Sequence, residues 1–149
     1  MSSVWFYLSL AVVAGFCLPT QAGINAHLNL WCHSAILAAA ISFTVGTLAL
    51  VIYLLILRIP LPEAGSLARS PWWIWSGGFI GAFFVASTVI LAPRLGAVSM
   101  VALIVTGQML ASVVLDHFGL IGYQIHPINW MRLAGILLLV AGVVLIQRF

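Results

Sequence analysis

The run from Ala35 to Leu57 constrains the fold most, because it carries no charged side chain over a length that can cross a membrane. A helix rises about 1.5 Å per residue, so roughly 20 apolar residues span the hydrocarbon core of a bilayer. Lipid offers the backbone no hydrogen-bonding partner, which favours a helix over any irregular conformation. The run therefore predicts a transmembrane helix, ended by Arg58, Pro60 and Pro62.

The same composition extends along the whole chain. Of the 149 residues, 64% are hydrophobic and 5% are charged, and the mean hydropathy is +1.26, whereas soluble domains average about 25% charged residues. We therefore expect an all-α integral membrane protein in which residues 1–149 form a single five-helix transmembrane domain. The expected helices cover about residues 4–25, 35–57, 72–92, 96–116 and 130–147.

The first expected helix has a competing interpretation as a signal peptide. Its apolar run VWFYLSLAVVAGFCL is followed by TQA, which imitates a small-residue cleavage site. Signal peptides carry positive charge before the apolar run, and here no Lys or Arg precedes it. We therefore expect a transmembrane helix.

The charged and reactive residues argue against several classes of function. The formal charge of +3 comes from five scattered Arg and two acidic residues, so no basic cluster favours nucleic acid. No HExxH, GxxxxGK or GxGxxG motif is present, and we expect neither an enzyme nor a cofactor. Cys17 and Cys32 lie too far apart on one helix for a disulfide. Zinc on Cys32, His33 and His27 is conceivable, but their spacing fits no standard finger, so no metal is expected.

The distribution of Arg over the two membrane faces suggests how the chain inserts. Five spans would place Arg58, Arg69 and Arg132 on one face and Arg94 and Arg148 on the other. This small difference specifies orientation weakly, because positive charge on cytoplasmic loops sets the direction of insertion. We therefore expect insertion in both orientations and an antiparallel homodimer, with ten helices arranged like an inverted repeat.

Polar side chains within the apolar runs are candidates for a substrate cavity. We select Gln21, Asn25, Thr88 and Gln108. A primary amide in a membrane needs an external partner, whereas Ser and Thr can bond to their own helix. Hydrogen bonding between helices is the alternative role for each of these residues. Gly77 and Gly81 form a GxxxG pair that would let two helices approach closely, although small residues are common in any membrane helix.

The helix expected over 96–116 is flanked by charges that oppose its dipole. Arg94, in a tight turn expected over 93–96, lies near its N-terminus, and Asp116 lies at its C-terminus. In an antiparallel dimer Asp116 of one copy and Arg94 of the other would share a membrane face and could pair. Arg132 of the same chain is the competing partner for Asp116. Asp116 could also simply mark where the helix leaves the membrane, or in a water-filled cavity it could bind and release a coupling proton.

Several segments together resemble the YdcZ-type, half-length members of the drug/metabolite transporter superfamily. They are GFCLPTQAGINAHL, AAAISFTVGTLAL, RLAGILLLVAGVVLI and, most specifically, the continuous run from Gly77 through Gly119. Full-length members of that superfamily are ten-helix inverted repeats, and its small multidrug resistance proteins are dual-topology dimers. Those small proteins use a membrane-embedded Glu in their first helix, where this chain has only Gln21.

The resemblance implies a secondary transporter of the bacterial inner membrane. Such a protein would be multi-pass, would work as a homodimer in the lipid bilayer and would move a small molecule by alternating access. A passive dual-topology channel and a non-transporting membrane scaffold are the alternatives.

Overall fold

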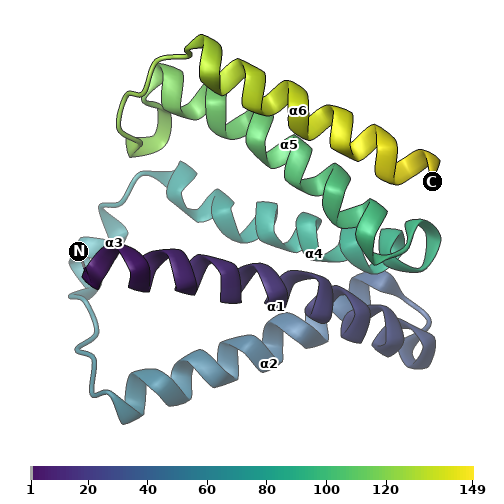
Figure 1. The fold of residues 1–149 in the computed structure, drawn as a ribbon. Coiled ribbons are helices and arrows are strands. Elements are labelled where there is room, and N and C mark those ends of the chain that lie inside the picture. The colour runs from purple at the N-terminus through teal and green to yellow at the C-terminus, as the bar shows by residue number, and fades with distance from the viewer. Residues whose placement is uncertain (1) are drawn as a thin grey trace. The chain divides into compact units, whose positions relative to one another are not determined.

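The computed structural model describes residues 2–149, which form helices and connecting segments (Figure 1). Within this described range, five helices are long and apolar enough to cross a membrane. The elements in chain order are α1 (Ser2–Cys32), α2 (Ala35–Ile56), α3 (Ala64–Ala68), η1 (Trp72–Trp75), α4 (Ser76–Leu95), α5 (Ala97–Phe118), η2 (Leu120–Gly122) and α6 (Trp130–Arg148). The prediction of an all-α protein with five long apolar helices, each fit to cross a membrane, is confirmed for the described residues.

The contacts within the chain divide it into two compact units. The N-terminal unit covers residues 1–94 and holds α1, α2, α3, η1 and nearly all of α4, and the C-terminal unit covers residues 95–149 and holds α5, η2 and α6. In each unit two long helices pack together, α1 with α2 and α5 with α6. The single transmembrane domain expected over residues 1–149 stays a prediction.

The first helix is longer than predicted, because it ends at Cys32 and not near residue 25. Pro19 lies inside it, where it removes one backbone donor and crowds the carbonyl one turn earlier, yet the helix continues through it to Cys32. The chain turns at His33, which has a positive φ of 53°. Ser34 then caps α2, since its side chain accepts a hydrogen bond from the Leu37 backbone N–H at 3.2 Å.

The junction between α4 and α5 also differs from the prediction. Helix α4 continues through Pro93 and Arg94 to Leu95, so the predicted end at residue 92 and the turn over 93–96 are wrong. Arg94 lies in the last turn of α4, where a cation stabilises the helix dipole. Gly96, with a φ of 76°, is the single residue that separates α4 from α5. The cation therefore belongs to the end of α4, and its placement complements that helix.

Helix α5 extends to Phe118, slightly beyond the predicted end at residue 116, and Gly119 caps it. Gly119 adopts the left-handed conformation with φ of 61°, and a Cβ at this position would lie 2.7 Å from Cγ1 of Ile125. Both features require glycine. Asn129 begins α6, because its side chain accepts a hydrogen bond from the Arg132 backbone N–H at 2.9 Å.

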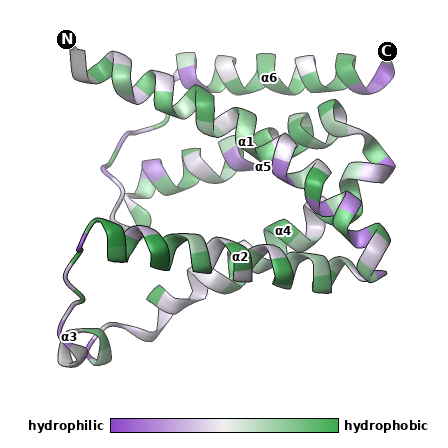
Figure 2. Cartoon of the chain, turned by 90° about the horizontal axis from the view of Figure 1, so that it is seen from below, coloured by the Kyte–Doolittle hydropathy of each residue, from purple (hydrophilic) through white to green (hydrophobic). Residues whose placement is uncertain are grey.

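Hydrophobic residues dominate the long helices, whereas the segment around α3 mixes hydrophilic and hydrophobic residues (Figure 2). In the N-terminal unit the buried residues of α1 and α2 include small ones, as shown by Ala22, Ala38 and Ala39. Of the GxxxG pair, Gly81 lies near the ring of Phe43 on α2, since a Cβ added there would be 3.5 Å from its Cζ atom, whereas a Cβ at Gly77 would meet open space. The contact at Gly81 is made by the end of a long side chain, and the backbones of α2 and α4 are not closely packed.

Candidate solute-binding site

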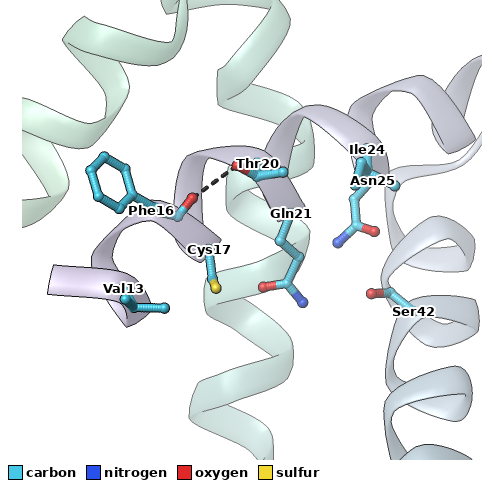
Figure 3. A pocket seen from close by; sticks show the side chains of 8 residues that line it. All are labelled: Val13, Phe16, Cys17, Thr20, Gln21, Ile24, Asn25 and Ser42. Carbon is cyan, nitrogen blue, oxygen red and sulfur yellow. Dashed lines mark hydrogen bonds between the residues drawn. The ribbon is translucent and has the colours of Figure 1, made fainter. Parts of the chain in front are cut away.

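A groove of about 430 Å³ lies in the N-terminal unit along one side of α1 (Figure 3). It is lined by seven residues of α1 and by Ser42 of α2, namely Val13, Phe16, Cys17, Thr20, Gln21, Ile24, Asn25 and Ser42. The α1 residues recur at intervals of three and four, which places them on one face of the helix. The extension of α1 beyond Pro19 is what carries Gln21 and Asn25 into the groove.

Asn25 is the most constrained polar residue of this groove. Its side chain is only 3% exposed, and its Nδ2 atom is buried without a hydrogen-bond partner among the described residues. A buried donor that lacks a partner costs about 1–3 kcal/mol, so native structures rarely leave one unused. The Nδ2 donor is therefore available to an acceptor from outside the described residues.

Gln21 lies one helical turn before Asn25, and its amide and that of Asn25 extend from the same side of α1 with Ser42 nearby (Figure 3). Gln21 and Ser42 also line a second groove of about 230 Å³, whose other residues are Phe43, Gly46, Thr47 and Leu50 of α2. The two grooves thus share this pair of lining residues. Two amides and one hydroxyl therefore form a polar centre between mainly apolar walls.

The remaining polar groups of the groove differ in their availability. The hydroxyl of Thr20 donates to the Phe16 carbonyl at 2.8 Å, which leaves it able only to accept. Cys17 is exposed as a free thiol. Among the described residues that line the groove there is no Arg, Lys, His, Asp or Glu. A bound group would therefore meet hydrogen-bonding partners and no opposite charge.

The other two predicted cavity residues lie elsewhere. Thr88 on α4 is buried, and its hydroxyl donates to the Val85 carbonyl of its own helix at 2.8 Å. Gln108 is exposed on α5 in the C-terminal unit. Neither residue lines the two grooves of the N-terminal unit. The structure thus brings Gln21 and Asn25 together, and a cavity role for Thr88 and Gln108 stays a prediction.

Asp116 contacts Arg132 of its own chain, the competing partner considered from the sequence. Arg132 Nη1 lies 3.4 Å from Asp116 Oδ2 and donates to the His126 carbonyl at 3.1 Å. The His126 backbone N–H donates in turn to the Asp116 carbonyl at 2.9 Å. Asp116 and Arg132 thereby fasten the loop between α5 and α6 to the helix ends. Pairing of Asp116 with Arg94 of a second copy stays a prediction, as does proton coupling.

The ion pair of Asp116 and Arg132 lines a separate groove of about 360 Å³ in the C-terminal unit, with Met109, Ser112, Val113, Gly135 and Ile136. Its two charges are about one-third exposed, so their attraction is weak. Within the described part of the chain, no cluster of three or more His, Cys, Asp or Glu side chains is placed to hold a metal ion.

Ser42 and Cys17 were not selected from the sequence as cavity residues. A single Ser in an apolar helix usually satisfies its hydroxyl on its own backbone, so its sequence context gives no signal. Cys17 precedes Gln21 by four residues and Asn25 by eight. This helical periodicity is the one pattern that could have assigned Cys17 to the face that carries both amides.

Comparison with known proteins finds a similar protein and a matching family. The chain is 25% identical over 142 residues to the "Inner membrane protein YdcZ" of Escherichia coli (strain K12), which covers 95% of this chain and 94% of that protein. No solved structure matches the chain. The relative and the five apolar helices place the protein in the inner membrane as a multi-pass protein. The model of the family described as "Putative inner membrane exporter, YdcZ" matches residues 6–145, and the chain therefore belongs to this family of inner membrane transporters.

Proposed function

We propose that this chain is one protomer of a homodimeric secondary transporter that exports a small molecule by alternating access. The groove on α1 is its substrate site, and the chain carries out transport and no catalysis. The observation that supports this proposal is the buried Nδ2 of Asn25, which lines a groove and lacks a partner among the described residues. A purely structural amide would be expected to bond to a neighbouring helix.

The proposed dimer is antiparallel. Its support is the nearly even division of Arg between the two expected membrane faces, which orients a single copy weakly. Gln108 adds a second argument, because it is exposed near the middle of α5, where lipid would leave its amide unsatisfied. A second copy would supply its partner, and would raise the number of helices from five to ten.

Transport is tested with purified protein reconstituted in liposomes. Labelled N-acetylleucinamide, tetraethylammonium and N-acetylleucine provide one uncharged, one cationic and one anionic solute of low permeability. Saturable, protein-dependent flux of any one of them supports a transporter. Flux that rises linearly with concentration indicates a channel, and liposomes that retain all three solutes favour the scaffold.

The site is tested through its own thiol. In a Cys32→Ser variant, Cys17 is the single cysteine, and the introduced hydroxyl can still donate to the Leu28 carbonyl that the Cys32 thiol contacts at 3.3 Å. Only a thiolate reacts with a maleimide, so a thiol facing lipid stays unmodified. We expect a water-soluble maleimide to modify Cys17 in the folded protein. A Cys17 that reacts only after denaturation would exclude this groove from the transport path.

A further inference from the structure

The charge of the ligand follows from what surrounds the groove. Its described walls carry no ionised side chain, and His27, the nearest ionisable residue beyond Asn25 along α1, is not part of them. In the N-terminal unit the charged residues are Arg58, Glu63, Arg69 and Arg94, which all lie in connecting segments or at a helix end. An ion without a counter-charge is strongly disfavoured at membrane depth. The groove therefore selects an uncharged ligand.

The hydrogen-bonding character of the ligand follows from Asn25. The unsatisfied atom is Nδ2, which donates, so the group placed against it must accept. Gln21 and Ser42 can each donate or accept, and they do not restrict the ligand further. Because Asn25 is 3% exposed, water competes weakly for its donor, and the bond contributes to binding more than it would at the surface.

The rest of the ligand faces apolar side chains. Val13, Phe16 and Ile24 are the hydrocarbon side chains of the lining. The groove volume of about 430 Å³ falls within the usual range for small-molecule sites, roughly 300–1,000 Å³. Burial of an apolar body against these side chains supplies affinity, whereas the amides determine orientation.

From these three properties we propose that the groove binds an uncharged, mainly apolar organic solute through an acceptor oxygen that bonds to Nδ2 of Asn25. The inference rests on the proposed function and names the substrate class of the same site. A solute of this class diffuses through the lipid bilayer without a transporter. Its transporter must therefore export the solute against this passive diffusion back into the cell.

Three probes with one carbon skeleton separate the contributions of charge and acceptor. Acetophenone has a carbonyl oxygen, ethylbenzene has none, and 1-phenylethylammonium has a cation at the same carbon atom. The readout is the rate at which a water-soluble maleimide modifies Cys17 in the Cys32→Ser protein, since Cys17 lies in the groove. Thermal unfolding with and without each probe provides a second readout that is independent of the thiol.

We expect acetophenone to protect Cys17 at a concentration about fivefold lower than ethylbenzene, which is the effect of one hydrogen bond. The cation should give no protection. Asn25→Leu removes the donor and keeps the branching of the side chain. In this variant the two protecting concentrations should differ only as far as acetophenone and ethylbenzene differ in their partition into the detergent micelle that surrounds the purified protein. Asn29→Leu makes the same exchange one turn further along α1, outside the groove, and should leave the difference intact.

Two results would overturn the proposal. One is that 1-phenylethylammonium protects Cys17 as well as acetophenone does. The groove would then still be a transport site, but one for cations. The other is an acetophenone preference that survives Asn25→Leu. The comparison of probes in the unmutated site needs no change at Asn25, so misfolding of that variant would not prevent a decision. A Cys17 that is unreactive without any probe would instead contradict the proposed function itself.

Discussion

Replacement of Asn25 by Leu tests whether this amide serves the fold or a ligand. Leu has the same branching as Asn but is larger and has no polar atoms. Asn25 lines the groove, which can accept the added volume, and because it is 3% exposed the exchange exposes little apolar surface. The Nδ2 atom has no partner among the described residues that the exchange would remove. We therefore expect Asn25→Leu to stabilise the ligand-free protein.

The magnitude follows from the cost of the unused donor. A buried group without a partner costs about 1–3 kcal/mol, so the free energy of unfolding should rise by up to that amount. If Asn25 instead bonded to a neighbouring helix, its loss would lower the free energy of unfolding by about 0.6 kcal/mol and at most about 1.7 kcal/mol. The two interpretations therefore predict changes of opposite sign.

The assay is reversible unfolding by sodium dodecyl sulfate in mixed micelles, followed by the fluorescence of the six Trp residues. Asn29→Leu is the matched control, because Asn29 lies in the same helix and is only partly buried. We expect this control to change stability by less than Asn25→Leu does. A decrease of about 0.6 kcal/mol or more for Asn25→Leu would refute the reasoning and assign Asn25 a structural partner.

Three further predictions concern topology, the ion pair and the end of α5. Reporter fusions at the C-terminus should give comparable cytoplasmic and periplasmic signals, and a signal confined to one side would replace the antiparallel dimer by a parallel one. Asp116→Arg and Arg132→Asp should each loosen the α5–α6 loop, measured as faster proteolysis, and the double variant should restore it. Rescue of dimerisation by Asp116→Arg with Arg94→Asp would instead support the inter-chain pair. Gly119→Ala should lower the thermal unfolding temperature, because residue 119 has a φ of 61° and an added Cβ would lie 2.7 Å from Ile125. The expected cost is at least about 1 kcal/mol. Gly135→Ala is the control and should leave the unfolding temperature unchanged, because a Cβ added there meets no neighbour.

The sequence alone was sufficient to predict the five spans. Runs such as Ala35 to Leu57 are apolar along their whole length. A single segment of this kind must form a helix in lipid, because only a helix satisfies its backbone hydrogen bonds internally. The same reasoning identified Gln21 and Asn25, since an amide at membrane depth requires a partner wherever the helices pack. These conclusions depend on the solvent and not on the contacts between helices.

Helix ends were harder to predict, because they depend on local geometry. The first helix continues to Cys32 since no residue after Pro19 stops it until Ser34 caps α2. The sequence places Arg94 at the start of the fourth membrane helix, whereas in the structure it closes the third, because the interruption is at Gly96 and not at Pro93. Proline and charge are ambiguous near a boundary, whereas a positive φ is a property of the folded chain.

Only the tertiary structure decided which polar side chains meet and which remain without a partner. Ser42 joins Gln21 and Asn25 because α2 packs against α1, whereas Thr88 uses its hydroxyl within α4. Arg132 reaches Asp116 because the loop between α5 and α6 returns α6 to the end of α5. An apolar sequence determines that its helices lie in the membrane, but it leaves their register open, because lipid and a neighbouring helix solvate an apolar face almost equally well.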